Sequence, residues 1–167
     1  MALHIERLAA HHLREGFDCG DASLNEFLQR QAGQLARRGL AKTYVARSND
    51  DLNVLGFVSV SAGQAETKQL PLHLKLPRYP APLLRIGRLA VDLRQQGQGT
   101  GQHLVSFALQ LALDFSQQVG LYAVVVDAKH DKAREFYEAL GFIAMLDDPL
   151  CLYLPISTLQ KTVGASH

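Results

Sequence analysis

The sequence predicts one α/β domain with a mixed β-sheet. Three observations lead to this fold class. Patterns typical of strands and of amphipathic helices alternate along the chain in the order β-α-β-β-(loop)-β-α-β-α-β-β. A continuous apolar run over residues 121–126 indicates a strand buried on both faces. No linker or internal repeat divides the 167 residues, so a single domain over residues 1–167 is expected.

Turn and cap signals divide this pattern into elements. Asp21 is expected to cap a helix that runs to about Arg38, where Gly39 ends it. Residues 62–82 are expected to form an irregular loop, because their four prolines oppose a continuous helix or a central strand. Strands are expected at residues 3–8, 43–47, 54–61, 84–93, 121–126, 142–145 and 150–154, and two further helices at 102–118 and 131–140.

The composition excludes several classes of protein. Hydrophobic residues make up 47% and charged residues 20%, which is typical of a soluble globular domain. Neither a run of about 18 uncharged apolar residues nor a secretory signal is found, so a cytoplasmic protein without a membrane segment is expected. Cys19 and Cys151 are far apart, and the histidines other than His130 show no ligand spacing, so neither a disulfide framework nor a metal site is expected.

The net charge of +1 conceals a segregation of charge along the chain. Residues 27–91 contain ten basic and three acidic residues, a balance of +7, and the rest of the chain has a balance of −6. From Thr67 to Val91 there is no carboxylate at all. Such segregation can create a positive face on a nearly neutral protein, or the basic residues can be scattered over different faces of the fold.

A glycine-rich turn separates the strand at 84–93 from the helix at 102–118. Gly97, Gly99 and Gly101 alternate with polar residues there, so main-chain amides can approach a phosphate closely and the helix N-terminus adds unpaired donors. The alternative is a tight turn without a ligand, which three alternating glycines make the less favoured reading. Gln102 and His103 follow instead of Lys and Ser or Thr, which argues against a nucleotide-binding Walker A loop. The GxGxG spacing and its late position argue against a dinucleotide fold.

Two motifs in the C-terminal half resemble those of the GNAT N-acetyltransferases. The segment Gln96–Gly101 (Q-x-x-G-x-G), after the strand residues Ile86–Asp92, is similar to the acetyl-CoA pyrophosphate loop of that family. The segment Ala133–Phe142 (A-x-x-F-Y-x-x-x-G-F) is similar to the family's second half. Together with Phe17–Gly20 and Leu76–Pro80, these segments resemble the GNAT toxins of bacterial toxin–antitoxin pairs over nearly the full chain.

The resemblance implies a GNAT fold, with a mixed, mostly antiparallel sheet that is splayed at the acetyl-CoA site and flanked by helices. It implies acetyl-CoA as the cofactor and acetylation of the α-amino group of aminoacyl-tRNA, which blocks translation. It also implies a ribbon-helix-helix antitoxin as partner and often a homodimer. The expected acetyl-CoA contacts are Leu89, Ala90, Val91, Gln96, Gly97, Gln98, Gly99, Thr100, Gly101 and Phe136.

Tyr137 is the expected acid that protonates the departing thiolate. A phenol with an ordinary pKa near ~10 is a suitable donor to a thiolate with a pKa of about 8.5. The alternative is a core tyrosine at the edge of a buried helix face. His130, where the wider family commonly has Asn, and Asp92 are candidates for the general base, although His130 can equally be a helix cap. Water can suffice, because an α-amino group with a pKa of ~7.7–8.0 is partly neutral at cellular pH.

The basic block favours RNA as the acceptor. A carboxylate-free stretch argues against an aminoglycoside substrate, for which an acidic cleft is needed. An acetyltransferase for protein N-termini, peptides or small amines, and a non-catalytic acyl-CoA-binding regulator, are the alternatives. The residues expected to bind tRNA phosphates are Arg37, Arg38, Lys42, Arg78, Arg85 and Arg88, each of which can instead be simply solvated.

Overall fold

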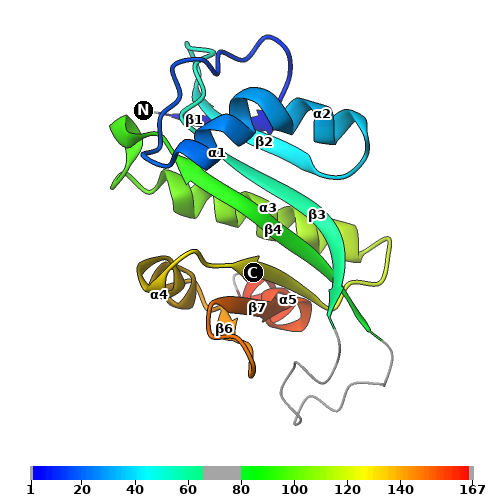
Figure 1. Cartoon of the computed structure of the whole chain (residues 1–167). Coiled ribbons are helices and arrows are strands. Elements are labelled where there is room, and N and C mark those ends of the chain that lie inside the picture. Colours follow the sequence, from blue (N-terminus) through cyan, green and yellow to red (C-terminus); the bar gives the residue numbers. More distant parts are fainter. Residues whose placement is uncertain (1, 66–79, 166–167) are drawn as a thin grey trace. The chain divides into compact units, whose positions relative to one another are not determined.

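The computed structural model of the chain describes residues 2–65 and 80–165 (Figure 1). Two compact units are formed. Unit 1 comprises the residues up to Ser61 together with Gly87–Ala108, and unit 2 comprises Ala62–Ile86 and the residues from Leu109 onward. The boundaries fall inside two strands and one helix, and the expected single domain over residues 1–167 stays a prediction. No helix in the described part of the chain is long and apolar enough to cross a membrane.

Seven strands form a mixed sheet in the order β1-β2-β3-β4-β5-β7-β6. The pair β4–β5 is parallel, and the other four pairs with a resolved register are antiparallel. This confirms the predicted α/β class with a mostly antiparallel sheet. The strands are β1 Leu3–Arg7, β2 Lys42–Ser48, β3 Gly56–Ala65, β4 Ala81–Val91, β5 Ala123–Asp127, β6 Ile143–Ala144 and β7 Cys151–Pro155. The helices are α1 Ala22–Glu26, η1 Phe27–Gln31, α2 Ala32–Arg37, η4 Leu93–Gln95, α3 Thr100–Ser116, α4 Asp131–Ala139 and α5 Ile156–Ala165.

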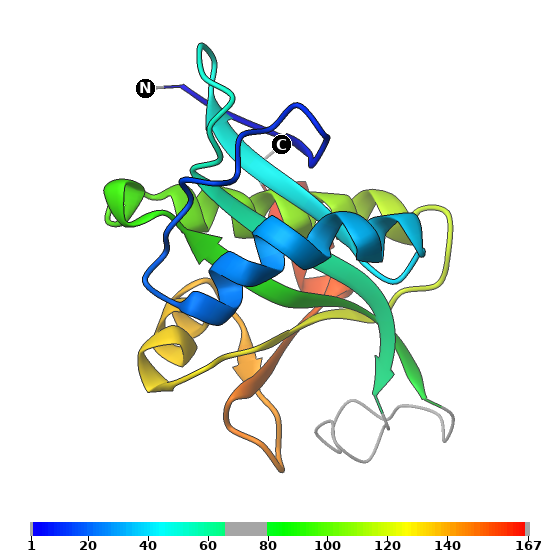
Figure 2. The same ribbon diagram turned by 45° about the horizontal axis from the view of Figure 1, so that its top comes forward.

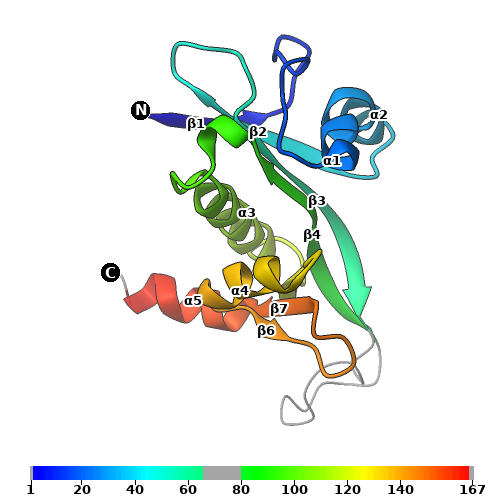
Figure 3. The same ribbon diagram turned by 60° about the vertical axis from the view of Figure 1, so that its left-hand side comes forward.

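In unit 1, helices cover both faces of the strands. The run α1-η1-α2 lies on one face and the first half of α3 on the other (Figure 2; Figure 3). On the first face Phe27 and Leu28 join Phe57 and Ala90 in one buried apolar cluster. On the second face, a Cβ at Gly56 would lie 3.0 Å from Cδ1 of Leu104 and 3.1 Å from the Ala90 carbonyl oxygen. Glycine at this position therefore allows α3 to approach the sheet closely.

The first helical region starts where the sequence predicts but does not continue as a regular α-helix. Asp21 is the N-cap, and its carboxylate accepts hydrogen bonds from the amides of Ser23 and Leu24. The residues Phe27–Gln31 form a π-helical segment, in which the Ala32 amide donates to the Phe27 carbonyl oxygen. The expected uninterrupted helix to Arg38 is thus wrong in this detail. The wider turn allows Phe27, Leu28 and Ala32 all to be buried, which a 3.6-residue pattern does not reveal.

In unit 2, β5 is almost completely buried between β4 and β7, and α5 lies beside β7 (Figure 3). The predicted loop at 62–82 is wrong at both ends, because β3 continues to Ala65 and β4 starts at Ala81. Pro82 has no amide hydrogen, but its carbonyl oxygen accepts from the Tyr122 amide at 2.9 Å, so the strand tolerates it. Helix α5, which the sequence pattern did not predict, begins immediately after Pro155. The remainder of the expected loop, residues 66–79, lies outside the described residues, and Arg78 with it.

Candidate active site

Strand β4 extends beyond its parallel pairing with β5. The register runs from Leu83 opposite Ala123 to Ile86 opposite Val126, and β4 continues to Val91. Leu89, Ala90 and Val91 thus follow the last residue that is paired with β5. An extended segment with unpaired peptide groups along one edge can bind an amide-containing ligand as an added strand. The predicted acetyl-CoA contacts in β4 require this arrangement, although the Val91 carbonyl oxygen already accepts a hydrogen bond from Nε2 of Gln96 at 3.1 Å.

Asp92 anchors the chain where it leaves β4. Its side chain is 2% exposed and caps η4 by accepting the Arg94 amide at 2.9 Å. It also accepts from the Arg94 guanidinium at 2.9 and 3.1 Å and from the Asp18 amide at 3.2 Å. Burial opposes ionisation, yet the hydrogen bonds from Arg94 and Asp18 prevail and hold the pKa of Asp92 below its usual value. These contacts favour an anchoring role for Asp92 over the role of general base.

The glycine-rich turn presents main-chain donors at the start of α3. Gly97 and Gly99 both have φ of 83°, in the left-handed region that glycine adopts without strain. The His103 amide donates to the Gly99 carbonyl oxygen at 3.1 Å and is the first of α3 with a main-chain acceptor. Within the described residues, the amides of Thr100, Gly101 and Gln102 have no such acceptor, as expected for the first turn of a helix. This end of α3 is therefore suited to bind an anion.

Thr100, the first residue of α3, has a buried hydroxyl that bears on what this site can bind. The residue is 1% exposed, and its Oγ1 has no hydrogen-bond partner among the described residues. A buried hydroxyl without a partner is unfavourable. A phosphate oxygen at the helix N-terminus would accept from this hydroxyl, so the residues present fit the diphosphate of acetyl-CoA.

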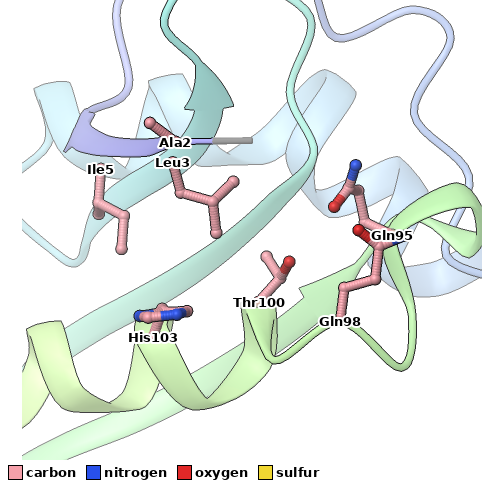
Figure 4. A pocket seen from close by; sticks show the side chains of 7 residues that line it. All are labelled: Ala2, Leu3, Ile5, Gln95, Gln98, Thr100 and His103. Atoms are coloured by element: carbon pink, nitrogen blue, oxygen red, sulfur yellow. The ribbon is translucent and has the colours of Figure 1, made fainter.

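A pocket of about 540 Å³ adjoins this helix start (Figure 4). Gln98 and Thr100 are residues predicted from the sequence. Gln95 and His103, which flank the loop, were missed, although their positions within four residues of it could have suggested them. No local pattern in the sequence indicates that the N-terminal strand also lines this pocket, because only the fold brings residues so far apart in sequence together. The pocket is lined by Ala2, Leu3, Ile5, Gln95, Gln98, Thr100 and His103.

Tyr137 lies in α4, in unit 2, and is 5% exposed. Its ring makes edge contacts with Phe136 and Phe142, with centroids 5.1 and 5.7 Å apart. Burial in this apolar environment raises the pKa of the Tyr137 phenol above its usual value. The phenol therefore stays protonated at neutral pH, as a proton donor must, but it is a weaker acid than its ordinary pKa suggests.

His130 is the N-cap of α4. Its Nδ1 accepts a hydrogen bond from the Ala133 amide at 3.1 Å. A ring nitrogen thus accepts the main-chain hydrogen bond that a side-chain oxygen commonly accepts at a helix N-terminus. This supports the capping interpretation of His130 over that of a general base.

The predicted RNA-binding residues differ in how they are held. Arg37 and Arg38 are exposed at the end of α2, and the Lys42 ammonium donates to the Ala36 carbonyl oxygen at 3.0 Å. Arg88 lies over the ring of Phe27, 4.1 Å from its centroid. Arg85, in unit 2, forms an ion pair with Asp127, so part of its donor capacity is already used.

Arg14 lies outside residues 27–91 and is not among the residues expected from the sequence to bind tRNA. A Cβ at Gly33 would lie 3.4 Å from Nη1 of Arg37 and 3.8 Å from Nη1 of Arg14. The ends of both side chains therefore lie close to Gly33 in α2. Arg14 comes from the loop before α1, at a distance in sequence that no local pattern bridges.

The fold also brings together a cluster of potential metal ligands that the spacing of the histidines along the sequence did not reveal. Glu6, His11 and His12 bring ligand atoms within 4.8 Å of one another. However, Nδ1 of His12 accepts from the Ala9 amide at 2.9 Å, so the proton of the ring is on Nε2, which donates to Glu6 at 2.9 Å. Hydrogen bonds from Arg47 and then His12 lower the pKa of Glu6 to about 2. The cluster is best explained as a structural hydrogen-bond network that holds the loop after β1.

Comparison with known proteins places the chain in the GNAT acetyltransferase family. The sequence profile of the acetyltransferase (GNAT) domain matches residues 39–144. A tRNA-acetylating toxin of Mycobacterium tuberculosis is 31% identical over 150 residues, which cover 89% of each chain. The structure of AtaT complexed with acetyl-methionyl-tRNAfMet is 31% identical, with a TM-score of 0.90 over 97% of this chain and 99% of that chain. AtaTR bound with acetyl-CoA is 32% identical, with a TM-score of 0.85 over 96% and 98%.

Proposed function

We propose that this chain is the toxin of a toxin–antitoxin pair. It transfers the acetyl group of acetyl-CoA to the α-amino group of aminoacyl-tRNA and thereby blocks translation. The observation that carries this proposal is the structural likeness to AtaT bound to acetyl-methionyl-tRNAfMet over 97% of the chain. The acetyltransferase profile ends at residue 144 and begins at residue 39. The likeness to the toxin thus extends beyond the domain that all such acetyltransferases share.

The residues of unit 1 bind and orient the cofactor. Bound acetyl-CoA supplies an activated acetyl thioester. The edge of β4 at Leu89–Val91, beyond the pairing with β5, would hold the ligand's amide-containing arm, and an amide of Leu89 or Ala90 would donate to the thioester oxygen as charge develops there. The amides at the start of α3 and the Thr100 hydroxyl bind the diphosphate. No side-chain nucleophile is required, because the amine attacks the thioester directly.

Tyr137 supplies the proton for the departing thiolate. The enclosure by Phe136 and Phe142 supports this role in one respect, since it keeps the phenol protonated and excludes water. Donation leaves a phenolate in an apolar environment, and the proton released by the attacking amine can restore the phenol. The amine itself has a pKa of ~7.7–8.0, so water can remove its proton.

The basic residues bind the acceptor. Arg37, Arg38, Lys42 and Arg88 neutralise phosphates of the tRNA without reading its sequence. Arg78 and Arg85 are proposed to contribute as well, Arg85 less strongly because of its ion pair with Asp127. Gln96, Gly97 and Phe136 complete the proposed set of cofactor contacts.

An antitoxin partner follows from the same comparisons. One similar structure is that of AtaT bound to the C-terminus of the antitoxin AtaR. A second similar structure is a complex of KacTA with DNA. We propose a ribbon-helix-helix antitoxin for this chain, together with a homodimer and a cytoplasmic location, where tRNA is found. An acidic or amphipathic antitoxin tail would complement the basic residues of unit 1.

Transfer of a labelled acetyl group tests the proposal. The protein is incubated with radiolabelled acetyl-CoA and tRNA charged with each amino acid in turn, with uncharged tRNA as control. Label on charged tRNA alone is the expected result. Label on protein N-termini, peptides or small amines instead would favour the alternative acetyltransferases. Binding of acetyl-CoA without transfer to any amine would identify a non-catalytic regulator.

A further inference from the structure

Arg88 is held by an aromatic ring rather than by a carboxylate. Its guanidinium carbon lies 4.1 Å from the centroid of the Phe27 ring, a cation–π contact. Phe27 is 1% exposed and stacks on Phe57, with centroids 5.8 Å apart, and Phe57 contacts Phe17 at 5.6 Å. The ring cannot move without disturbing the core of unit 1. The guanidinium of Arg88 thus packs on a ring whose position is fixed by the core.

Arg88 differs from three other arginines in how its guanidinium is held. Arg47, Arg85 and Arg94 form ion pairs with Glu6, Asp127 and Asp92, respectively. Arg88 is exposed and, among the described residues, forms neither an ion pair nor a hydrogen bond. A guanidinium that packs on a ring and has no ion-pair partner within residues 2–65 and 80–165 can offer a pair of N–H donors to a ligand. Such a pair matches the two oxygens of a carboxylate or a phosphate.

The place of Arg88 on β4 links it to the reaction. Side chains alternate along a strand, so Arg88 and Ala90 share one face, about 7 Å apart along the chain. Ala90 belongs to the same buried cluster as Phe27 and to the segment proposed to hold acetyl-CoA. Phe27 is also the first residue of the π-helical segment η1, and such segments are frequent at functional sites. The free edges of Arg88 thus lie beside the segment at which the amine must react.

We propose that Arg88 binds the phosphodiester that precedes the 3′-terminal adenosine of aminoacyl-tRNA. This inference rests on the proposed function. An amino acid esterified to tRNA has no free carboxylate, so this phosphodiester is the anionic group closest to the reacting amine. Two hydrogen bonds from the edge of Arg88 to its two free oxygens fix the terminal nucleotide and direct the amine towards the thioester. Arg88 is in this sense a positioning residue that acts on the acceptor and not on acetyl-CoA.

Two small acceptors, of which only one contains a phosphodiester, test the contact of Arg88 with that group. The first is 3′-aminoacylamino-3′-deoxyadenosine, which has no phosphodiester, and the second carries an additional 5′-linked cytidylate and therefore one phosphodiester. The variant Arg88→Gln is expected to lower kcat/KM for the second acceptor by about 10-fold to 100-fold, the range of a charged hydrogen-bonded contact. Turnover of the first acceptor and the KM for acetyl-CoA are expected to be unchanged. Arg7→Gln, an exposed strand arginine with no assigned role, is the matched control.

The outcomes separate this inference from the proposed function. Equal losses for both acceptors, or no loss for either, would overturn the phosphate contact. If the wild-type protein acetylates neither acceptor nor aminoacyl-tRNA, the proposed function fails. Equilibrium binding of the cytidylate-containing acceptor then still tests Arg88: weaker binding by Arg88→Gln but not by Arg7→Gln supports the contact, and equal binding contradicts it. Phe27→Leu, checked for folding by thermal unfolding, is expected to give part of the Arg88→Gln effect.

Discussion

Unit 1 and unit 2 contain groups prepared for chemistry in opposite ways. In unit 1, the start of α3 has main-chain amides and a Thr100 hydroxyl that lack partners among the described residues, beside a pocket of about 540 Å³. In unit 2, Tyr137 is enclosed by Phe136 and Phe142 and is 5% exposed. Donors for a charged ligand have to remain unsatisfied until it binds, whereas a proton donor has to be shielded so that its proton is retained. The comparison teaches that binding and proton transfer place opposite demands on packing.

The largest effect is expected from removing the hydroxyl of Tyr137. Tyr137→Phe preserves the aromatic packing, so turnover of aminoacyl-tRNA should fall by about 10²-fold to 10⁴-fold, as for loss of a general acid. Acetyl-CoA affinity should be nearly unchanged when measured by calorimetry, because most of the proposed contacts lie in unit 1 and the ring of the substituted residue is retained. Tyr122→Phe, in the same unit, is the matched control and should leave turnover unaffected. Unchanged turnover in Tyr137→Phe would identify Tyr137 as a core residue only.

The next largest effect is expected at the glycine-rich turn. Gly99→Ala forces a side chain into a backbone with φ of 83°, at a cost of ~1–2 kcal/mol, and should weaken acetyl-CoA binding about 10-fold. Gly39→Ala, with φ of 72° and no atom within 4 Å of the added Cβ, imposes similar strain away from the turn. Gly39→Ala should therefore reduce stability without reducing acetyl-CoA affinity. Equal loss of affinity in both variants would show that general destabilisation, not the turn, is responsible.

A smaller effect is expected from the anchor of the turn. Asp92→Asn removes a buried charge that accepts from Arg94 and Asp18, so unfolding in urea should show a loss of ~1–3 kcal/mol at neutral pH. Because the pKa of Asp92 is lowered in the folded state, its stabilisation is present above its ordinary pKa of ~3.9 and is lost as the pH falls through the lowered value. Asp147→Asn, at an exposed site, should cause no comparable loss. A variant as stable as the wild type would rule out the anchoring role.

The smallest effect is expected at Glu6, which is not among the predicted contacts of the cofactor. The pKa of this carboxylate is lowered from 4.5 to about 2 by Arg47 and His12. Stability that depends on it is therefore present above pH 4.5 and is lost as the pH falls from 4.5 to about 2. Urea midpoints measured across this interval should decline less in Glu6→Gln than in the wild type. Arg47→Gln removes the main cause of the lowered pKa of Glu6, so stability should stop falling at a higher pH than in the wild type. If the urea midpoint depends on pH identically in all three proteins, Glu6 does not hold the loop after β1.

The difference between the two regions also explains what could be predicted from sequence. The turn at Gly97–Gly101 has a local signature, because left-handed backbone and a helix start are encoded by adjacent residues. The cap at Asp21 and the strands were predictable for the same reason. The enclosure of Tyr137 was only partly predictable, because the helical pattern places it at the edge of a buried face but its ring contact with Phe142 depends on the left-handed turn at Gly141.

The errors have physical causes of the same kind. The π-helical segment at Phe27–Gln31 was missed because it depends on how Phe27, Leu28 and Ala32 all reach the core. The prolines at 80 and 82 indicated a loop, but the parallel neighbour β5 stabilises β4 beyond them. Helix α5 follows Pro155 without a turn signal, and its first amide, that of Ile156, donates to the Tyr122 carbonyl oxygen, a contact no local pattern shows. The wall of the pocket from Ala2, Leu3 and Ile5 is likewise a product of topology.

Identification of the acetylated atom tests the proposed reaction most directly. Charged tRNA is incubated with the protein and acetyl-CoA and digested with ribonuclease, and the released 3′-terminal aminoacyl-adenosine is analysed by tandem mass spectrometry. The predicted result is an acetyl group on the α-amino nitrogen, strongly reduced with Tyr137→Phe in the same incubation time and absent with uncharged tRNA. Unmodified aminoacyl-adenosine in the presence of bound acetyl-CoA, or acetylation of a different atom, would contradict it.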